Sequence, residues 1–225
     1  MNDVSRPDLV IAVDGPSGSG KSSTSRAVAR RLGAAYLDTG SMYRALATWC
    51  ASRGVGPDDT ATVVRAAREL PIQIDTDPAG FRVCLAGRDV TAELHTPEVS
   101  GIVAGYAAIR PARDALTEMM RAIIADRGRI VVEGRDITTV VAPDADVRVL
   151  LQADPRRRIE RRVRQLNGAA DEDTVTRQVV GRDAADAASS EFESPAEGVT
   201  LIDSSELDLA AVIELVIDLV PDSLR

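Results

Sequence analysis

The residues with the clearest chemical pattern lie near the start of the chain, directly after the apolar run Leu9–Val13. Positions 15–22 spell GPSGSGKS, which fits G-x-x-x-x-G-K-[ST], a turn that binds phosphate through backbone N–H groups and the next helix N-terminus. In this pattern the lysine neutralises the outer phosphates of a nucleotide, and a hydroxyl ligates Mg²⁺. The predicted nucleotide-binding residues are Gly15, Pro16, Ser17, Gly18, Ser19, Gly20, Lys21, Ser22 and Ser23, with Lys21 also catalytic and Ser22 or Ser23 as the metal ligand.

Lysine usage makes this match more specific than the pattern alone. Lys21 is the only lysine among the 27 basic residues of the chain, and all the others are arginine. An arginine would serve a surface role equally well, so a lone lysine at this position indicates a need for an ammonium group. The alternative is a flexible Gly/Ser turn that carries an incidental lysine.

Two further polar segments follow the predicted strands Ala35–Leu37 and Ile130–Val132, at the strand ends where open α/β sheets bind ligands. The first, positions 38–44, brings together a carboxylate, a hydroxyl, a tyrosine and an arginine. The second, positions 133–136, could present a donor and an acceptor to the edge of a base, with Glu133 orienting Mg²⁺-bound water. The alternatives are a helix-capping aspartate in the first segment and a surface Arg–Asp pair in the second.

The densest positive charge lies at positions 156–164, RRRIERRVR. Such a run is usually a solvated helix face. Arg158, Arg161 and Arg162 nevertheless share one face at helical spacing, and that face could point at a triphosphate. We therefore assign Arg158 to the predicted nucleotide site.

Composition restricts the class of protein. A chain of 225 residues with 44% hydrophobic residues fits one α/β domain with insertions. The formal net charge of −8 argues against nucleic-acid binding, although a local arginine cluster would still serve a nucleotide. Cys50, Cys84 and His95 show no pattern of a zinc site. No signal region and no apolar run of about 20 residues occurs, so we expect a cytoplasmic monomer without a membrane span.

The predicted strands are short apolar runs that alternate with helical segments, which is typical of a doubly wound parallel sheet. The five strands are Leu9–Val13, Ala35–Leu37, Ile130–Val132, Val147–Leu151 and Val199–Ile202. Helices are predicted over residues 22–32, 38–52, 57–70, 97–108, 111–126, 156–166 and 208–220. Alternating residues at 72–74 and 81–86, around a turn at 77–80, predict a small antiparallel insert.

Five blocks of sequence together resemble bacterial cytidylate kinase, in register over nearly the whole chain. These blocks are GPSGSGKSS, LDTGSMYR, AGRDVTAEL, PARDAL and VVEGRDITTVVAPDA. The resemblance implies an α/β P-loop NTPase with a five-stranded CORE sheet, an NMP-binding arm enlarged by the antiparallel insert, and a LID. The CORE would cover residues 1–38, 110–168 and 198–225, the arm 39–109, and the LID 169–197.

The same resemblance implies a reaction and the residues that perform it. The activity would be transfer of the γ-phosphoryl group of ATP to CMP or dCMP, with Mg²⁺. Arg135 and Arg182 would join Lys21 as catalytic residues. The expected acceptor-binding residues are Ser17, Asp38, Thr39, Tyr43, Arg44, Arg113, Arg135, Asp136, Arg182 and Asp186. Ser189 replaces the last arginine of the LID motif R-D-x-x-D-x-x-R, and Thr138 stands where glycine is common.

Two other functions stay open from the residues alone. One is another small-molecule kinase on this fold, with UMP, AMP or a shikimate-type alcohol as acceptor. An alcohol would need a carboxylate base, for which Asp38 is available. The other is a non-catalytic module that senses ATP, although a sensor needs one nucleotide pocket and no acceptor-site arginines.

Overall fold

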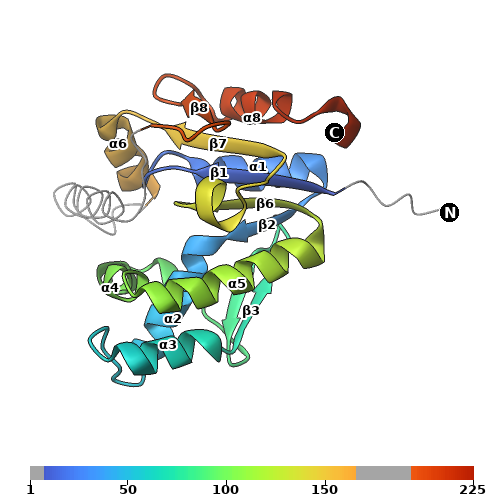
Figure 1. Cartoon of the computed structure of the whole chain (residues 1–225). Coiled ribbons are helices and arrows are strands. Elements are labelled where there is room, and N and C mark those ends of the chain that lie inside the picture. The colour runs from blue at the N-terminus through green and yellow to red at the C-terminus, as the bar shows by residue number, and fades with distance from the viewer. Residues whose placement is uncertain (1–7, 166–193) are drawn as a thin grey trace. The chain divides into compact units, whose positions relative to one another are not determined.

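The computed structural model describes residues 8–165 and 194–225, and these residues form two compact units. The core unit runs up to Leu37 and resumes at Arg127, while the second unit is Asp38–Asp126. Figure 1 shows the elements along the chain. The predicted arm at 39–109 stays a prediction, and most of the predicted LID at 169–197 lies outside the described residues.

The core unit is built on a five-stranded sheet in the order β2-β6-β1-β7-β8 (Figure 1). The chain passes from β1 to the edge strand β2, returns to β6 beside β1, and then crosses to β7 and β8 on the other side. The pairs β1–β6, β1–β7 and β7–β8 are parallel, which confirms the predicted doubly wound α/β fold. The strands are β1 (Leu9–Asp14), β2 (Ala35–Asp38), β6 (Arg129–Gly134), β7 (Val147–Gln152) and β8 (Thr200–Asp203).

Runs of β-branched residues explain why these segments form the middle of the sheet. Ile11 and Val13 of β1 and Val131 and Val132 of β6 have no exposed surface, and within the core unit α1 and the segment after β6 pack against both strands. The strands extend beyond the apolar runs at their carboxyl ends, where β1 reaches Asp14. The first polar residue after each apolar run is therefore held in the sheet rather than in a loop.

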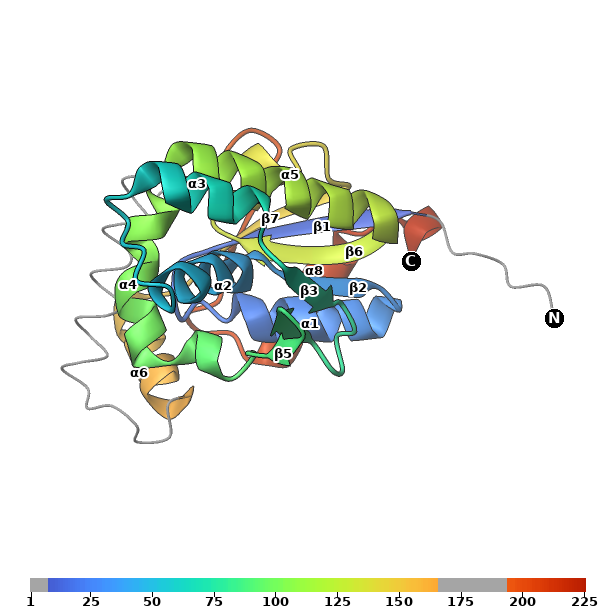
Figure 2. The same cartoon turned by 90° about the horizontal axis from the view of Figure 1, so that it is seen from below.

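Three helices and two short turns complete the described part of the core unit. They are α1 (Lys21–Leu32), α6 (Pro155–Gln165), α8 (Leu209–Asp218), the π-helical turn η2 (Ile137–Val141) and the 3₁₀ turn η3 (Asp222–Leu224). Helix α1 packs against α8 and against β1 and β6 (Figure 2). Asp208 caps α8 by accepting a hydrogen bond from the Ala211 N–H at 2.8 Å.

The second unit combines helices with a small antiparallel sheet in the order β3-β4-β5, as the alternating insert predicts. Met42, Leu46 and Cys50 lie on the buried face of α2, which packs against α3 and α4. The elements are α2 (Thr39–Ala51), α3 (Thr60–Arg68), β3 (Ile72–Asp75), β4 (Arg82–Leu85), β5 (Arg88–Asp89), the 3₁₀ turn η1 (Glu93–His95), α4 (Pro97–Ala107) and α5 (Arg110–Arg127).

Two local predictions differ from the structure. Helix α3 begins at Thr60 and not at residue 57, because the Asp59 carboxylate accepts a hydrogen bond from the Thr62 N–H at 3.1 Å and sets the first turn there. The sequence also gave no sign of η2, whose backbone bonds include Ala142 N–H to the Ile137 carbonyl at 2.8 Å. This is an i→i+5 bond, the spacing of a π-helix.

Within residues 8–165 and 194–225, no helix has the length and apolar character needed to cross a bilayer.

Burial in the sheet predicts a contrast between two leucines on neighbouring strands. Leu151 of β7 is fully buried, whereas Leu201 of β8 is 45% exposed. Leu151→Ala should lower the free energy of unfolding by about 2–5 kcal/mol, because it removes packed methyl groups and leaves a cavity. The matched variant Leu201→Ala should change it by about 0.5 kcal/mol or less. Urea unfolding followed by circular dichroism measures both, and equal losses would contradict the strand assignment.

Candidate nucleotide-binding site

The glycine-rich loop connects the carboxyl end of β1 to the first residue of α1. Gly18 has φ +78°, and a Cβ added there would lie 2.6 Å from the carbonyl oxygen of Arg158. Only glycine fits this conformation and this close approach. Among the described residues, no side chain caps α1, so its N-terminus is available to an anion. Ser22 and Ser23 are exposed in the first turn of that helix.

Carbonyl groups at the start of the loop accept hydrogen bonds from two cationic side chains. Arg135 Nη1 donates to the Gly15 carbonyl at 2.9 Å, and Lys21 Nζ donates to the Pro16 carbonyl at 3.3 Å. Arg135 follows β6, so one predicted catalytic residue already contacts the backbone of the loop. Lys21 is half-buried at the first position of α1.

The arginines of α6 contact the loop in a way that the sequence did not predict. Arg158 is buried, and its Nη1 donates to the Ser17 carbonyl at 3.2 Å. Arg161 Nη1 donates to the Ser19 carbonyl at 3.3 Å and to Ser204 Oγ at 3.0 Å, while its Nη2 donates to the Ser204 carbonyl at 2.7 Å. In this structure both guanidinium groups therefore support the backbone of the phosphate loop, and a direct phosphate contact by Arg158 stays a prediction.

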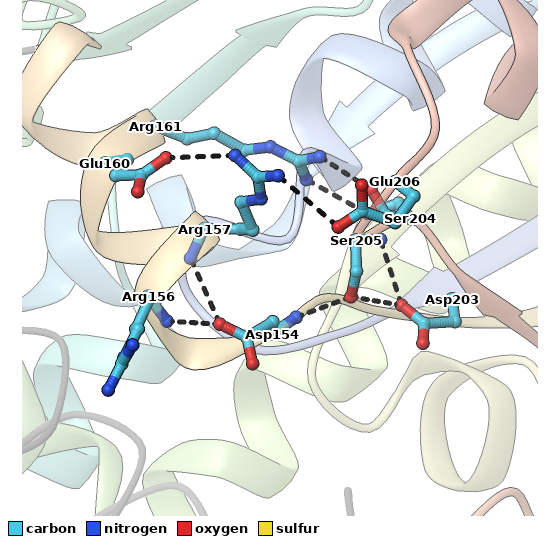
Figure 3. Close-up of polar contacts among 9 residues, drawn as sticks. All are labelled: Asp154, Arg156, Arg157, Glu160, Arg161, Asp203, Ser204, Ser205 and Glu206. Atoms are coloured by element: carbon cyan, nitrogen blue, oxygen red, sulfur yellow. Dashed lines mark hydrogen bonds and ion pairs between the residues drawn. The ribbon is translucent and has the colours of Figure 1, made fainter.

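Helix α6 is itself tied to the end of β8, as Figure 3 shows. The Asp154 carboxylate accepts the N–H of Arg156 at 2.8 Å, which caps the first turn of α6. The Asp154 N–H donates to Ser205 Oγ at 2.8 Å, and that hydroxyl donates to the Asp203 carboxylate at 2.5 Å. These bonds fix the start of α6 and hence the direction in which its arginines leave the helix.

The carboxylate of Asp14, the last residue of β1, lies almost completely buried. It accepts three hydrogen bonds: Ile137 N–H at 2.9 Å, Thr138 N–H at 2.8 Å and Thr138 Oγ1–H at 2.7 Å. Burial raises the pKa of Asp14, and the bonds from Thr138 and Ile137 oppose that rise because they favour the charged form. Asp14 thus holds the turn η2, which begins one residue after Asp136.

Glu133, the predicted orienter of Mg²⁺-bound water, is buried at the end of β6. It accepts a hydrogen bond from the Tyr36 hydroxyl at 2.5 Å. That bond joins β6 to the edge strand β2 and gives Glu133 a structural partner. Among the described residues, no group of three His, Cys, Asp or Glu side chains could hold a metal ion.

The predicted residues of the second unit gather around the N-terminus of α2. The Asp38 carboxylate accepts hydrogen bonds from the Ser41 N–H at 3.2 Å and the Ser41 hydroxyl at 2.7 Å, so it caps this helix. A Cβ added at Gly40 would lie 2.8 Å from Arg44 Nη1, which shows that Gly40 leaves room for that guanidinium. Arg44 Nε is buried and has no hydrogen-bond partner among the described residues.

A second arginine stands beside the same helix. The guanidinium carbon of Arg113 lies 5.9 Å from the ring centroid of Tyr43, and Arg113 Nη1 donates to the Ala107 carbonyl at 3.4 Å. Thr39 is buried at the first position of α2. Arg44 and Arg113 thus both lie in the second unit, and guanidinium groups are well suited to bind a phosphate group.

The structure therefore brings the predicted residues together in two sets. The core-unit set is Gly15, Pro16, Ser17, Gly18, Ser19, Gly20, Lys21, Ser22, Ser23, Arg135, Asp136 and Arg158, and the second-unit set is Asp38, Thr39, Tyr43, Arg44 and Arg113. Arg182, Asp186 and Ser189 lie outside the described residues.

Sequence reasoning missed three supporting residues. Asp14 stands directly before the glycine-rich loop, and an aspartate at the end of an apolar strand was a signal that went unused. Gly40 shows its role only once the position of Arg44 is known. Ser204 lies 185 residues from Ser19, whose carbonyl oxygen is 3.1 Å from the Ser204 hydroxyl. No local pattern in the sequence marks such a contact.

A glycine-rich loop between a central parallel strand and a helix that starts with lysine defines a P-loop fold that binds nucleotide phosphates. The family model for cytidylate kinase matches residues 11–222. A cytidylate kinase of Cutibacterium acnes is 54% identical over 223 residues, which cover 99% of this chain and 100% of the relative. One of Corynebacterium efficiens is 45% identical over 216 residues, 94% of each chain. The chain belongs to the cytidylate kinase family.

A solved structure shows a similar fold at low sequence identity. A protein from Eubacterium ventriosum that is described as uncharacterized superposes with a TM-score of 0.52 and 10% identity, over 93% of this chain and 96% of its own. At that identity the likeness concerns the fold alone.

The geometry of the loop predicts how Gly18→Ala will behave. The added Cβ would meet the Arg158 carbonyl and force the loop to shift, so affinity for ATP should fall about tenfold or more. Gly54→Ala is a matched control, because Gly54 has φ +69° but open space around it. It should strain the backbone without changing ATP affinity. Calorimetric titration with ATP would contradict the loop assignment if the two variants bound equally well.

Proposed function

We propose that this chain transfers the γ-phosphoryl group of ATP to the phosphate of CMP or dCMP, which yields ADP and CDP or dCDP. One observation carries the proposal: a chain of the cytidylate kinase family folds with its P-loop held by donors from two distant segments, the predicted catalytic residue Arg135 and the arginines of α6. ATP is the donor that the family implies.

The acceptor chemistry needs no proton abstraction by the protein. The attacking atom is an oxygen of an already ionised phosphate, and it forms a bond to the γ-phosphorus of ATP as the bond from that phosphorus to the β–γ bridging oxygen breaks. Catalysis then depends on positioning and on positive charge around the transferring group. Lys21 and Arg135 are proposed to supply that charge, together with Arg182.

Arginines of the second unit are proposed to bind the phosphate of the acceptor. Arg44 has a buried Nε with no hydrogen-bond partner among the described residues, and Arg113 stands next to Tyr43 on the same unit. An arginine fork matches the oxygens of a phosphate in geometry and charge. Asp136 is proposed to accept a hydrogen bond from the amino group of cytosine, and Ser17 and Thr39 are among the further proposed acceptor-binding residues.

The exposed hydroxyls of Ser22 and Ser23 fit a role toward Mg²⁺, because hard oxygen ligands suit that ion and both sit in the first turn after the loop. When bound, Mg²⁺ neutralises charge on the β- and γ-phosphate oxygens. Ser22 is the first choice as its protein ligand.

One observation counts against the rival kinases that phosphorylate an alcohol. Such an enzyme needs a carboxylate base near its acceptor. Both oxygens of Asp38, the candidate base, already accept hydrogen bonds from Ser41 as the cap of α2. Capping therefore accounts for this aspartate without a proton-transfer role.

Comparison of acceptors tests the proposal. An assay that couples ADP release to a spectroscopic signal, run with CMP, dCMP, UMP, AMP and shikimate, should give the fastest turnover with CMP or dCMP. The kcat/KM ratio of CMP to UMP should be about tenfold or more, because the cytosine amino group satisfies a buried acceptor that uracil leaves unpaired. A reaction without acceptor measures background ATP hydrolysis. Fastest turnover with UMP, AMP or shikimate would overturn the cytidylate assignment.

Chemical labelling tests the role of Lys21 without relying on turnover. An amine-directed reagent should modify two groups, Lys21 and the α-amino group of the chain, because Lys21 is the only lysine. Mg²⁺·ATP should slow labelling of Lys21 and leave labelling of the α-amino group unchanged, as mass spectrometry of peptides would show. Equal labelling of Lys21 with and without nucleotide would show that it does not contact the phosphates.

A further inference from the structure

The contact between Asp14 and the turn η2 lies outside the phosphate loop and is built entirely within the core unit. Oδ1 of Asp14 accepts the Ile137 N–H, and Oδ2 accepts both the N–H and the hydroxyl of Thr138. Asp14 and Thr138 are 3% and 4% exposed, so water does not compete for these bonds. A buried carboxylate with three donors from two consecutive residues holds those residues in one conformation.

The turn that Asp14 holds also has backbone hydrogen bonds of its own. Its bonds include Val140 N–H to the Asp136 carbonyl at 2.9 Å and Val141 N–H to the same oxygen at 3.1 Å. Single π-helical turns of this kind are rare and often occur at functional positions. Because the first two N–H groups of the turn donate to Asp14 and not to the preceding backbone, the carboxylate takes the place of a helix cap.

Arg135 adds a contact in the opposite direction. Asp14 reaches from the end of β1 to the residues that follow Asp136, while Arg135 reaches back to the Gly15 carbonyl at 2.9 Å. Two sets of bonds therefore hold the segment around Arg135–Asp136. Arg135 itself donates to Gly15, the first residue of the phosphate loop, and the two residues after Asp136 donate to Asp14, the last residue of β1. Asp136 is 8% exposed and contributes to the raised pKa of Asp14 through charge repulsion.

We propose that Asp14 is a positioning residue for recognition of the acceptor base. The hydrogen bond from the Thr138 hydroxyl to Asp14 helps to fix the turn that follows Arg135–Asp136. The inference rests on the proposed function, because it takes Asp136 to be the residue that meets cytosine. Thr138 is the informative position. Glycine is common at this position in the family that the sequence resembles, and glycine has no hydroxyl to donate to Asp14. The phosphate loop has its own support from Arg158 and Arg161, so loosening the turn affects the acceptor more than ATP.

Three threonine variants separate the hydroxyl from the shape of the side chain. Thr138→Val keeps the volume and removes the donor to Asp14. Thr138→Ser keeps the donor and removes a methyl group. Thr139→Val changes the next residue of the same turn, which is exposed, and serves as the control. Asp14→Asn is a further variant, although it turns one acceptor of a buried site into a donor and can prevent folding.

Steady-state kinetics with CMP, UMP and ATP are the test. Thr138→Val should raise the KM for CMP about fivefold and lower the CMP-to-UMP ratio of kcat/KM, while the KM for ATP changes less than about twofold. Thr138→Ser and Thr139→Val should behave as the unmodified chain. Hydrogen exchange of the Ile137 amide should be faster in Thr138→Val than in Thr138→Ser, which reports the turn without reference to activity.

The outcomes that overturn the inference differ from those that overturn the function. Unchanged KM for CMP in Thr138→Val, or an equal rise in the KM values of CMP and ATP, would remove the positioning role and leave the kinase assignment intact. Failure of Thr138→Ser to restore the KM for CMP would show that side-chain packing, not the hydroxyl, matters. If the unmodified chain phosphorylated no CMP or dCMP, the function and this inference would fall together.

Discussion

The nucleotide site depends on how both polar atoms of each peptide group in the phosphate loop are satisfied. The N–H groups face an anion, and the carbonyl oxygens need hydrogen-bond donors from the protein. A loop that presents N–H groups to an anion must find other donors for its carbonyl oxygens, since an unsatisfied buried carbonyl costs free energy comparable to a lost hydrogen bond. Here those donors are side chains: Arg135 for Gly15, Arg158 for Ser17, and Arg161 for Ser19. Their positive charge also lies close to the place where phosphates would bind.

The chemistry of arginine explains why this chain uses it so widely around the loop. A guanidinium has five N–H donors in a fixed plane, so one side chain can serve several acceptors at once. Arg158 donates to the carbonyls of both Ala153 and Ser17, and Arg161 bridges the loop to Ser204. Lysine presents a single flexible ammonium group, which suits a moving phosphate better than a fixed scaffold. The single lysine stands at the one position where the P-loop pattern requires it.

Local patterns in the sequence were enough for the strands, the glycine-rich loop and the antiparallel insert, because apolar runs and turn residues act over a few neighbours. They were not enough for η2, whose conformation depends on Asp14, more than 120 residues earlier. Helical spacing placed Arg158 and Arg161 on one face of α6 but left open whether that face meets phosphates or backbone carbonyls. Asp154 and Ser205 decide the direction of that helix, and their pairing is again distant in sequence.

The order of the strands has a consequence for how the chain acquires its site during synthesis. The glycine-rich loop is made early, yet its supports come from residues 120, 141 and 185 positions later, in Arg135, Arg158 and Ser204. Contacts of such long range form slowly, and they cannot form before the later segments exist. A growing chain thus carries a complete phosphate-binding motif for most of its synthesis without the means to hold it in shape. The loop therefore reaches the hydrogen-bonded arrangement of this fold only after the segment that contains Ser204 has been made.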